Sequence, residues 1–81
     1  MKITTAIKML MKVNGLSQGR MAKMCGFKDY HNVQIRLNRD GIGFDSALDM
    51  LNVMGYEVVI RENRTGRRRE DEIIITEEDE V

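Results

Sequence analysis

Side chains that both donate and accept hydrogen bonds are concentrated in residues 31–39. They are His31, Asn32, Gln34 and Asn38, with Arg36 and Arg39 among them. In the major groove of DNA each base pair presents its own pattern of donors and acceptors, to which Asn and Gln bind at adenine and Arg or Lys at guanine. The set therefore predicts base contacts by the amides and the imidazole, and phosphate contacts by Arg36 and Arg39. For His31 a phosphate contact and a plain surface position stay open as alternatives.

Further candidates for phosphate contacts precede this segment. They are Gln18 with the first amides of its predicted helix, and the side chains of Lys23 and Lys28. The net charge is zero, but residues 1–44 carry eight Lys or Arg against two Asp, and residues 45–81 carry five against eleven acids. The front half, at plus six, could meet a polyanion such as double-stranded DNA. The alternative is that these charges only keep a small protein soluble.

Catalysis and metal binding find little support in the sequence. Cys25 is the single cysteine and His31 the single histidine, so neither a disulfide within the chain nor a Cys/His metal cage can form. Asp45 and Asp49 lack the spacing of a calcium loop. We expect no catalytic residue, no metal and no cofactor, and we interpret Cys25 as a small buried apolar residue.

The length and composition are those of one small domain. The chain has 81 residues, 42% of them hydrophobic and 32% charged, without proline. No apolar run approaches the ~18 residues that span a bilayer, and the N-terminal segment lacks the apolar stretch of a secretory signal. We therefore expect a cytoplasmic protein that does not bind membranes.

Apolar residues at helical spacing predict two helices before residue 26. The first, from residue 4 or 5 to about 14, has an apolar stripe of Ile3, Ala6, Ile7, Leu10 and Val13. The second spans residues 17–25, because the Ser17 hydroxyl can cap its first turn and Gly26 can adopt the left-handed conformation that ends it.

Two more helices are predicted before residue 56. The third opens at residues 28–30 and ends at residues 38–40, with Tyr30, Val33 and Leu37 pointing inward. We interpret Ile35 as a core residue in preference to a contact for a thymine methyl group. The fourth is capped by Asp45 or Ser46, with an apolar stapling contact at its entry, and ends at a glycine. Its entry residue is Phe44, its predicted buried stripe is Ala47, Leu48, Leu51 and Met54, and its last glycine is Gly55.

The apolar period then changes to two. Residues 56–61 and 72–76 are rich in β-branched side chains and predict a hairpin. Two apolar strands are marginally stable alone, so a helix face or another chain must cover them. Dimerisation through these strands is one way to do so, and pairing within or between chains stays open. The acids at 70–72 and 77–80 are interpreted as protection against aggregation. Arg67, Arg68 and Arg69 either contact DNA or pair with these acids.

Residues 16–27 resemble the second helix and turn of Cro/CI-type (Xre-family) helix-turn-helix repressors. The Ser17-Gln18 pair opens the helix, the Met21-Ala22 pair packs it, and Gly26 marks the turn. Residues 32–39 are similar to the recognition helix of that family and residues 44–55 to its next helix. Between residues 26 and 33 there is one residue more than the commonest spacing, and residues 38–41 replace the frequent Glu-Arg/Asn-Gly ending.

The resemblance covers about residues 3–55 and implies a mainly α fold. It implies a four-to-five-helix lambda-repressor-like domain over residues 1–55. The extension at 56–81, whose hairpin is predicted from its own apolar period, is expected to help form a homodimer. The implied function is sequence-specific transcriptional regulation, by repression at a palindromic DNA site, of bacterial, phage or mobile-element type. The alternative is a helix-turn-helix interaction module, such as an antitoxin or a phage-encoded inhibitor of a host nucleic-acid-binding protein.

Overall fold

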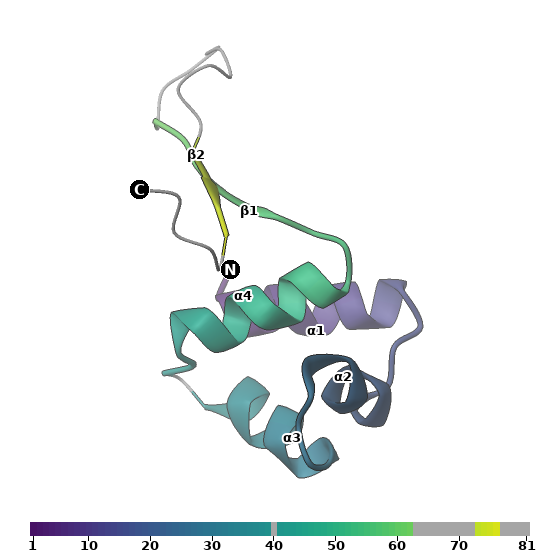
Figure 1. Cartoon of the computed structure of the whole chain (residues 1–81). Coiled ribbons are helices and arrows are strands. Elements are labelled where there is room, and N and C mark those ends of the chain that lie inside the picture. Colours follow the sequence, from purple (N-terminus) through teal and green to yellow (C-terminus); the bar gives the residue numbers. More distant parts are fainter. Residues whose placement is uncertain (40, 63–72, 77–81) are drawn as a thin grey trace.

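The computed structural model describes residues 1–39, 41–62 and 73–76, which form four helices and a two-stranded antiparallel sheet (Figure 1). The elements are α1 (Ile3–Val13), α2 (Gln18–Cys25), α3 (Tyr30–Asn38), α4 (Phe44–Val53), β1 (Val58–Ile60) and β2 (Ile73–Ile75). The prediction of a mainly helical chain ending in a hairpin is confirmed. Among the described residues the number of helices is four.

The predicted apolar stripe of α1 is only partly buried. Ile7 is fully buried and Ala6 and Leu10 are half-buried, whereas the other buried residues of the helix, Thr4 and Met11, lie outside that stripe. Ile3 and Val13, assigned to the buried stripe, are 44% and 77% exposed. The helix packs against both α3 and α4, and the positions of these two helices determine which of its residues are buried. The sequence of α1 by itself does not encode those positions.

The predicted ends of α2 are confirmed. The Ser17 hydroxyl accepts a hydrogen bond from the Arg20 amide at 3.1 Å, which satisfies one donor of the first turn. Gly26 ends the helix with φ at 79°, a conformation that costs any residue with a Cβ atom. The turn between α2 and α3 is therefore encoded locally.

Helix α3 is capped by Asp29, whose carboxylate accepts the His31 amide proton at 2.9 Å. Val33 and Leu37 are 0% and 2% exposed, as predicted. The inward placement of Tyr30 is wrong, because the first residue of the helix lies beyond the core and is 47% exposed. The assignment of Ile35 to the core is also wrong, since its side chain is 54% exposed.

Helix α4 begins earlier than predicted. Its N-cap is Gly43, no side chain caps it, and neither Asp45 nor Ser46 takes that role. Phe44 therefore lies in the first turn and is 56% exposed. The buried stripe of α4 includes the predicted Ala47, Leu48 and Leu51, but also Met50, which is fully buried, whereas Met54 is only half-buried.

The four helices share one apolar core. Figure 1 shows α1 and α4 side by side, with α2 and α3 beneath them and the hairpin on the opposite side. Cys25 is half-buried and packs against this core, which supports its interpretation as an apolar residue, with its sulfur 3.6 Å from that of Met21. None of the described helices has the length and apolar character needed to cross a bilayer.

The hairpin pairs Val58 with Ile75, Val59 with Ile74 and Ile60 with Ile73. Both strands are shorter than predicted, and they pair within one chain. Val58 packs against the helical core. The four outer members are more exposed: Val59 at 39%, Ile60 at 55%, Ile73 at 59% and Ile74 at 54%. The arginines at 67–69 and the acids at 70–72 and 77–80 lie outside the described residues.

Candidate functional site

Helix α3 carries an exposed stripe formed by His31, Gln34, Ile35 and Asn38. These positions are three and four apart, so they share one face of the helix. The opposite face carries the buried Val33 and Leu37. The structure therefore brings three of the four predicted base-contact residues together on a surface that the described chain leaves uncovered.

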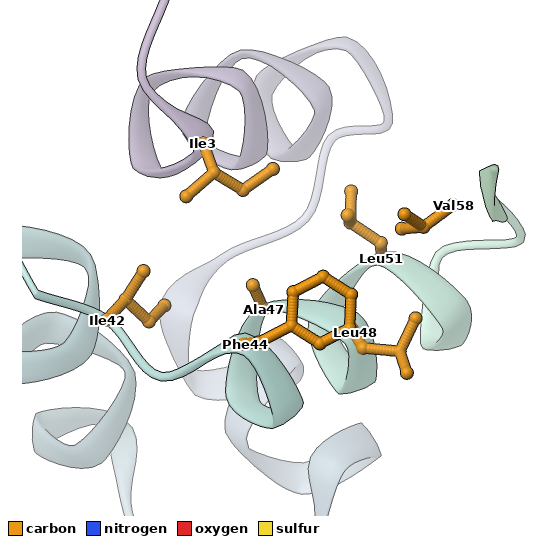
Figure 2. Close-up of a pocket in the computed structure, with 7 residues that line it drawn as sticks. All are labelled: Ile3, Ile42, Phe44, Ala47, Leu48, Leu51 and Val58. Carbon is orange, nitrogen blue, oxygen red and sulfur yellow. The ribbon is translucent and has the colours of Figure 1, made fainter. Parts of the chain in front are cut away.

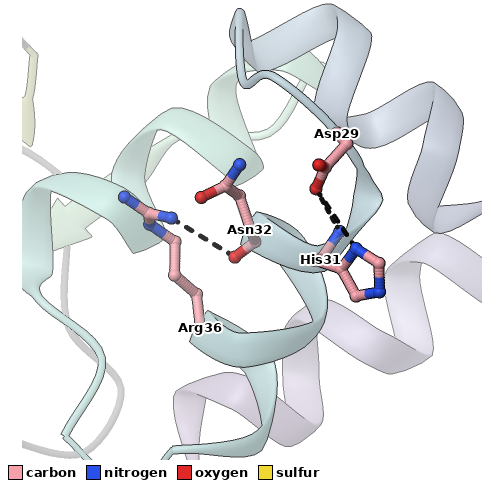
Figure 3. Close-up of polar contacts among 4 residues, drawn as sticks. All are labelled: Asp29, His31, Asn32 and Arg36. Atoms are coloured by element: carbon pink, nitrogen blue, oxygen red, sulfur yellow. Dashed lines mark hydrogen bonds and ion pairs between the residues drawn. The ribbon is translucent and has the colours of Figure 1, made fainter.

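The N-terminal end of this stripe is organised around His31. Its Nδ1 lies 3.5 Å from Oδ1 of Asp29, the same oxygen that caps the helix (Figure 3). The Tyr30 ring stacks on the imidazole with 4.2 Å between centroids. The imidazole side chain is still 60% exposed, so an approaching ligand can reach it.

The C-terminal end of the stripe is tied to α1. The Lys8 ammonium group donates a hydrogen bond of 3.2 Å to the side-chain carbonyl of Asn38. That bond orients the Asn38 amide and adds a positive charge at the edge of the stripe. Lys8 was not among the predicted site residues, and no local pattern could have found it, because it lies 30 residues from its partner.

Asn32 and Arg36 project from a different side of α3 than His31 does (Figure 3). The Arg36 guanidinium donates to the Ser46 hydroxyl at 3.2 Å and to the Asn32 carbonyl at 3.3 Å. It also lies 4.5 Å from the centroid of the Phe27 ring, within the range of a cation–π contact. Arg36 therefore connects α3 to the first turn of α4 and to the turn before α3.

A polar hollow of about 350 Å³ lies beside the stripe. It is lined by Asn32, Ile35, Arg36, Arg39, Gly41, Ile42, Gly43 and Ser46. Arg39 follows the last residue of α3, is exposed, and has no hydrogen-bond partner within the described part of the chain. The hollow thus combines two guanidinium groups with the edge of the α3 stripe.

The remaining predicted phosphate contacts lie on α2 and in the turn after it. Gln18 is the half-buried first residue of α2, while Lys23 and Lys28 are exposed. Lys23 also lines a shallow surface hollow with Arg20 and Met24. Arg20, which was not among the predicted phosphate contacts, lies three residues before Lys23 and therefore on the same face of the helix.

No group of three or more His, Cys, Asp or Glu side chains within the described ranges could hold a metal ion. Burial raises the pKa of the Cys25 thiol, and the charge of Asp49 raises it further against the opposing effect of Arg36. A thiol with a raised pKa is mostly protonated at neutral pH and is a weak nucleophile. Cys25 therefore adds no chemistry to the α3 surface.

A second surface feature is lined mainly by residues of α1 and α4. An apolar groove of about 270 Å³ is lined by Ile3, Ile42, Phe44, Ala47, Leu48, Leu51 and Val58 (Figure 2). Ile3 and Phe44 remain 44% and 56% exposed at its border. Because Val58 also pairs with Ile75, the groove is continuous with the hairpin.

No protein-family model matches the chain, and no match was found among the curated proteins or the solved structures. The resemblance to Xre-family regulators accordingly depends on the sequence of residues 16–27, 32–39 and 44–55 alone.

Proposed function

We propose that this chain is a sequence-specific DNA-binding regulator with a lambda-repressor-like domain, in which α2 and α3 form the helix-turn-helix and α3 enters the major groove. The observation that carries the proposal is the exposed stripe of His31, Gln34 and Asn38. A major groove about 12 Å wide admits one helix, and imidazole and amide groups can bind the donors and acceptors of its base edges.

Basic residues near both ends of α3 support the proposal. Lys28 precedes the helix, Arg39 follows it and Lys23 lies on α2, and all three are exposed. Phosphate contacts by such residues fix the register of a protein on the duplex, while base contacts determine the sequence. Lys8 supplies a further cation, and its bond to Asn38 leaves the Asn38 amide protons to donate to a base.

In this proposal the main role of Arg36 is to position α3. Its guanidinium is engaged with Ser46, the Asn32 carbonyl and the Phe27 ring. These contacts tie α3 to the first turn of α4 and to the turn before α3, and the retained charge still attracts a polyanion over a short range. Asn32, which faces the same side, then serves the phosphate backbone beside the polar hollow and not the bases.

A homodimer through the hairpin completes the proposal. Val59, Ile60, Ile73 and Ile74 leave both faces of a two-stranded sheet apolar and exposed, an arrangement that is marginal in water without a cover. A second copy offers the same hairpin and the same adjoining groove, which suits a two-fold interface. Two α3 helices would then meet a palindromic site with half-sites about 34 Å apart, and occupancy would block transcription.

The test is selection of duplexes from a random DNA library, followed by affinity measurement on the selected site. We expect one palindromic sequence, bound with an affinity that falls steeply as salt rises, because cations released from phosphates drive binding. The double variant Gln34→Ala/Asn38→Ala should lose at least about 30-fold on that site, since each of the two base contacts contributes about 1–3 kcal/mol.

The matched control is Asn52→Ala, which removes an exposed amide from α4. It should leave the affinity unchanged. If the double variant keeps full selectivity, α3 is not the recognition helix. If no duplex is selected at all, the interaction-module alternative takes precedence, and the ligand is then a protein.

A further inference from the structure

Ile35 is an apolar side chain in the middle of a polar recognition surface. It follows Gln34 directly, lies one helical turn from His31 and Asn38, and is 54% exposed. The core receives the opposite face of α3 through Val33 and Leu37. Core packing therefore does not explain an isoleucine at this position.

Exposure alone does not argue for a function, because isolated exposed apolar residues are common. The neighbours of Ile35 make the difference. On one side lie the donor and acceptor groups of the stripe, and on the other lies the polar hollow with Arg36 and Arg39. The isoleucine thus lies between the groups that suit base edges and the charges that suit phosphates.

Among the DNA bases, thymine is the one whose major-groove edge suits an apolar side chain next to hydrogen-bonding groups. It is the only one of the four with an apolar group, the C5-methyl, in the major groove, and apolar side chains contact that methyl. The methyl points toward the outer part of the groove, near the backbone of its own strand. A side chain between a base-reading stripe and a phosphate-binding hollow is suitably located to reach it.

We propose that Ile35 is a specificity-determining residue that contacts the C5-methyl group of a thymine in each half-site. The inference rests on the proposed function, since it needs α3 in the major groove. Contact excludes water from both apolar groups. It favours thymine over cytosine, which has no methyl, and it complements the hydrogen bonds of Gln34 and Asn38.

The experiment replaces each thymine of the selected duplex in turn by deoxyuridine, which removes only the methyl group. Binding of the wild-type chain and of Ile35→Ala is measured by fluorescence anisotropy. At one thymine per half-site we expect the wild type to lose about fourfold in affinity per methyl, as burial of one such group predicts. The Ile35→Ala variant should bind the thymine and deoxyuridine duplexes equally.

Two controls separate this contact from general effects. Met9→Ala removes a side chain that is 51% exposed on α1 and should keep the full sensitivity to deoxyuridine. Gln34→Ala should weaken binding yet keep that sensitivity, because it removes a hydrogen-bonding group and not the apolar contact. Circular dichroism of Ile35→Ala should match the wild type, since the replaced side chain lies outside the core.

Sensitivity of Ile35→Ala equal to that of the wild type would overturn the inference while leaving the proposed function intact. So would a wild type that tolerates deoxyuridine at every position. A chain that selects no duplex overturns the proposed function itself, and the inference fails with it. The selection step thus distinguishes the two failures.

Discussion

The helical core and the hairpin use the same kind of side chain in opposite surroundings. Ile7, Val33 and Met50 are 0% exposed within the four helices. Ile60 and Ile73, equally apolar, are 55% and 59% exposed in the hairpin. Four helices can enclose their apolar side chains on all sides. A two-stranded sheet has no second layer of its own, so its apolar side chains stay in contact with water.

This difference indicates which part of the chain can fold by itself. The core receives side chains from all four helices, and α1 contacts both α3 and α4. The hairpin is attached through Val58 and through the segment before β1, where the Asn14 amide donates to the Tyr56 hydroxyl at 3.1 Å. We therefore expect the helices to fold without the hairpin, and the hairpin to depend on a second chain.

The largest expected difference between the two regions is the loss of stability when an isoleucine is replaced by alanine in each of them. Ile7→Ala should lower the free energy of unfolding by about 2–5 kcal/mol, because it leaves a cavity in a closed core. Ile73→Ala should cost less than about 1 kcal/mol at protein concentrations too low for association, since its side chain is already in water. Urea denaturation followed by circular dichroism measures both. Equal losses would mean that the hairpin packs as tightly as the helices.

Making the outer face of the hairpin polar tests whether it forms the dimer interface. Val59 and Ile74 are cross-strand partners on the face opposite Val58 and Ile75. The double variant Val59→Thr/Ile74→Thr should weaken dimerisation by at least about tenfold, through loss of apolar contact, without changing the helix content. Sedimentation velocity over a concentration series gives the dissociation constant.

The control for this variant is Met9→Thr, which makes an equally exposed apolar residue polar on α1. It should leave association unchanged. If the hairpin variant and the control give the same dissociation constant as the wild type, the hairpin is not the dimer interface. A wild type that stays monomeric at high concentration would contradict the interface as well.

Local features of the fold could be predicted from the sequence. The Ser17 cap depends on one hydroxyl and an amide three residues on, and the turns at Gly26 and Gly55 depend on positive φ values of 79° and 93°. Each involves a few neighbouring residues, so its chemistry is contained in the local sequence. The strands were found for the same reason, from a short run of β-branched residues.

Features set by tertiary contact could not be predicted. The inward faces of α1 and of the start of α3 depend on the helices against which they pack, so Ile3 and Tyr30 were wrongly assigned to the core. In the candidate site, the exposed positions of His31, Gln34 and Asn38 followed from helical periodicity. The contacts of Arg36 with Ser46 and of Lys8 with Asn38 join separate helices, and only the fold reveals them.

The smallest expected effect concerns Cys25, which lies at the border between core and solvent. Burial, helped by Asp49, raises the pKa of its thiol in the folded chain above that of the unfolded chain. The folded state therefore favours the protonated thiol. The resulting stabilisation is complete below the unfolded pKa and is lost as the pH rises through the folded pKa.

Stability measured by urea denaturation between pH 7 and pH 10 should consequently fall more steeply for the wild type than for Cys25→Ala, because the other titrating groups are common to both chains. Alkylation of the wild-type thiol near pH 8.5 should also be slower in buffer than in denaturing urea, since less thiolate is present in the folded state. Parallel stability curves together with equal alkylation rates would contradict this prediction. Cys25 would then be exposed to solvent, like the outer residues of the hairpin, and would not belong to the helical core.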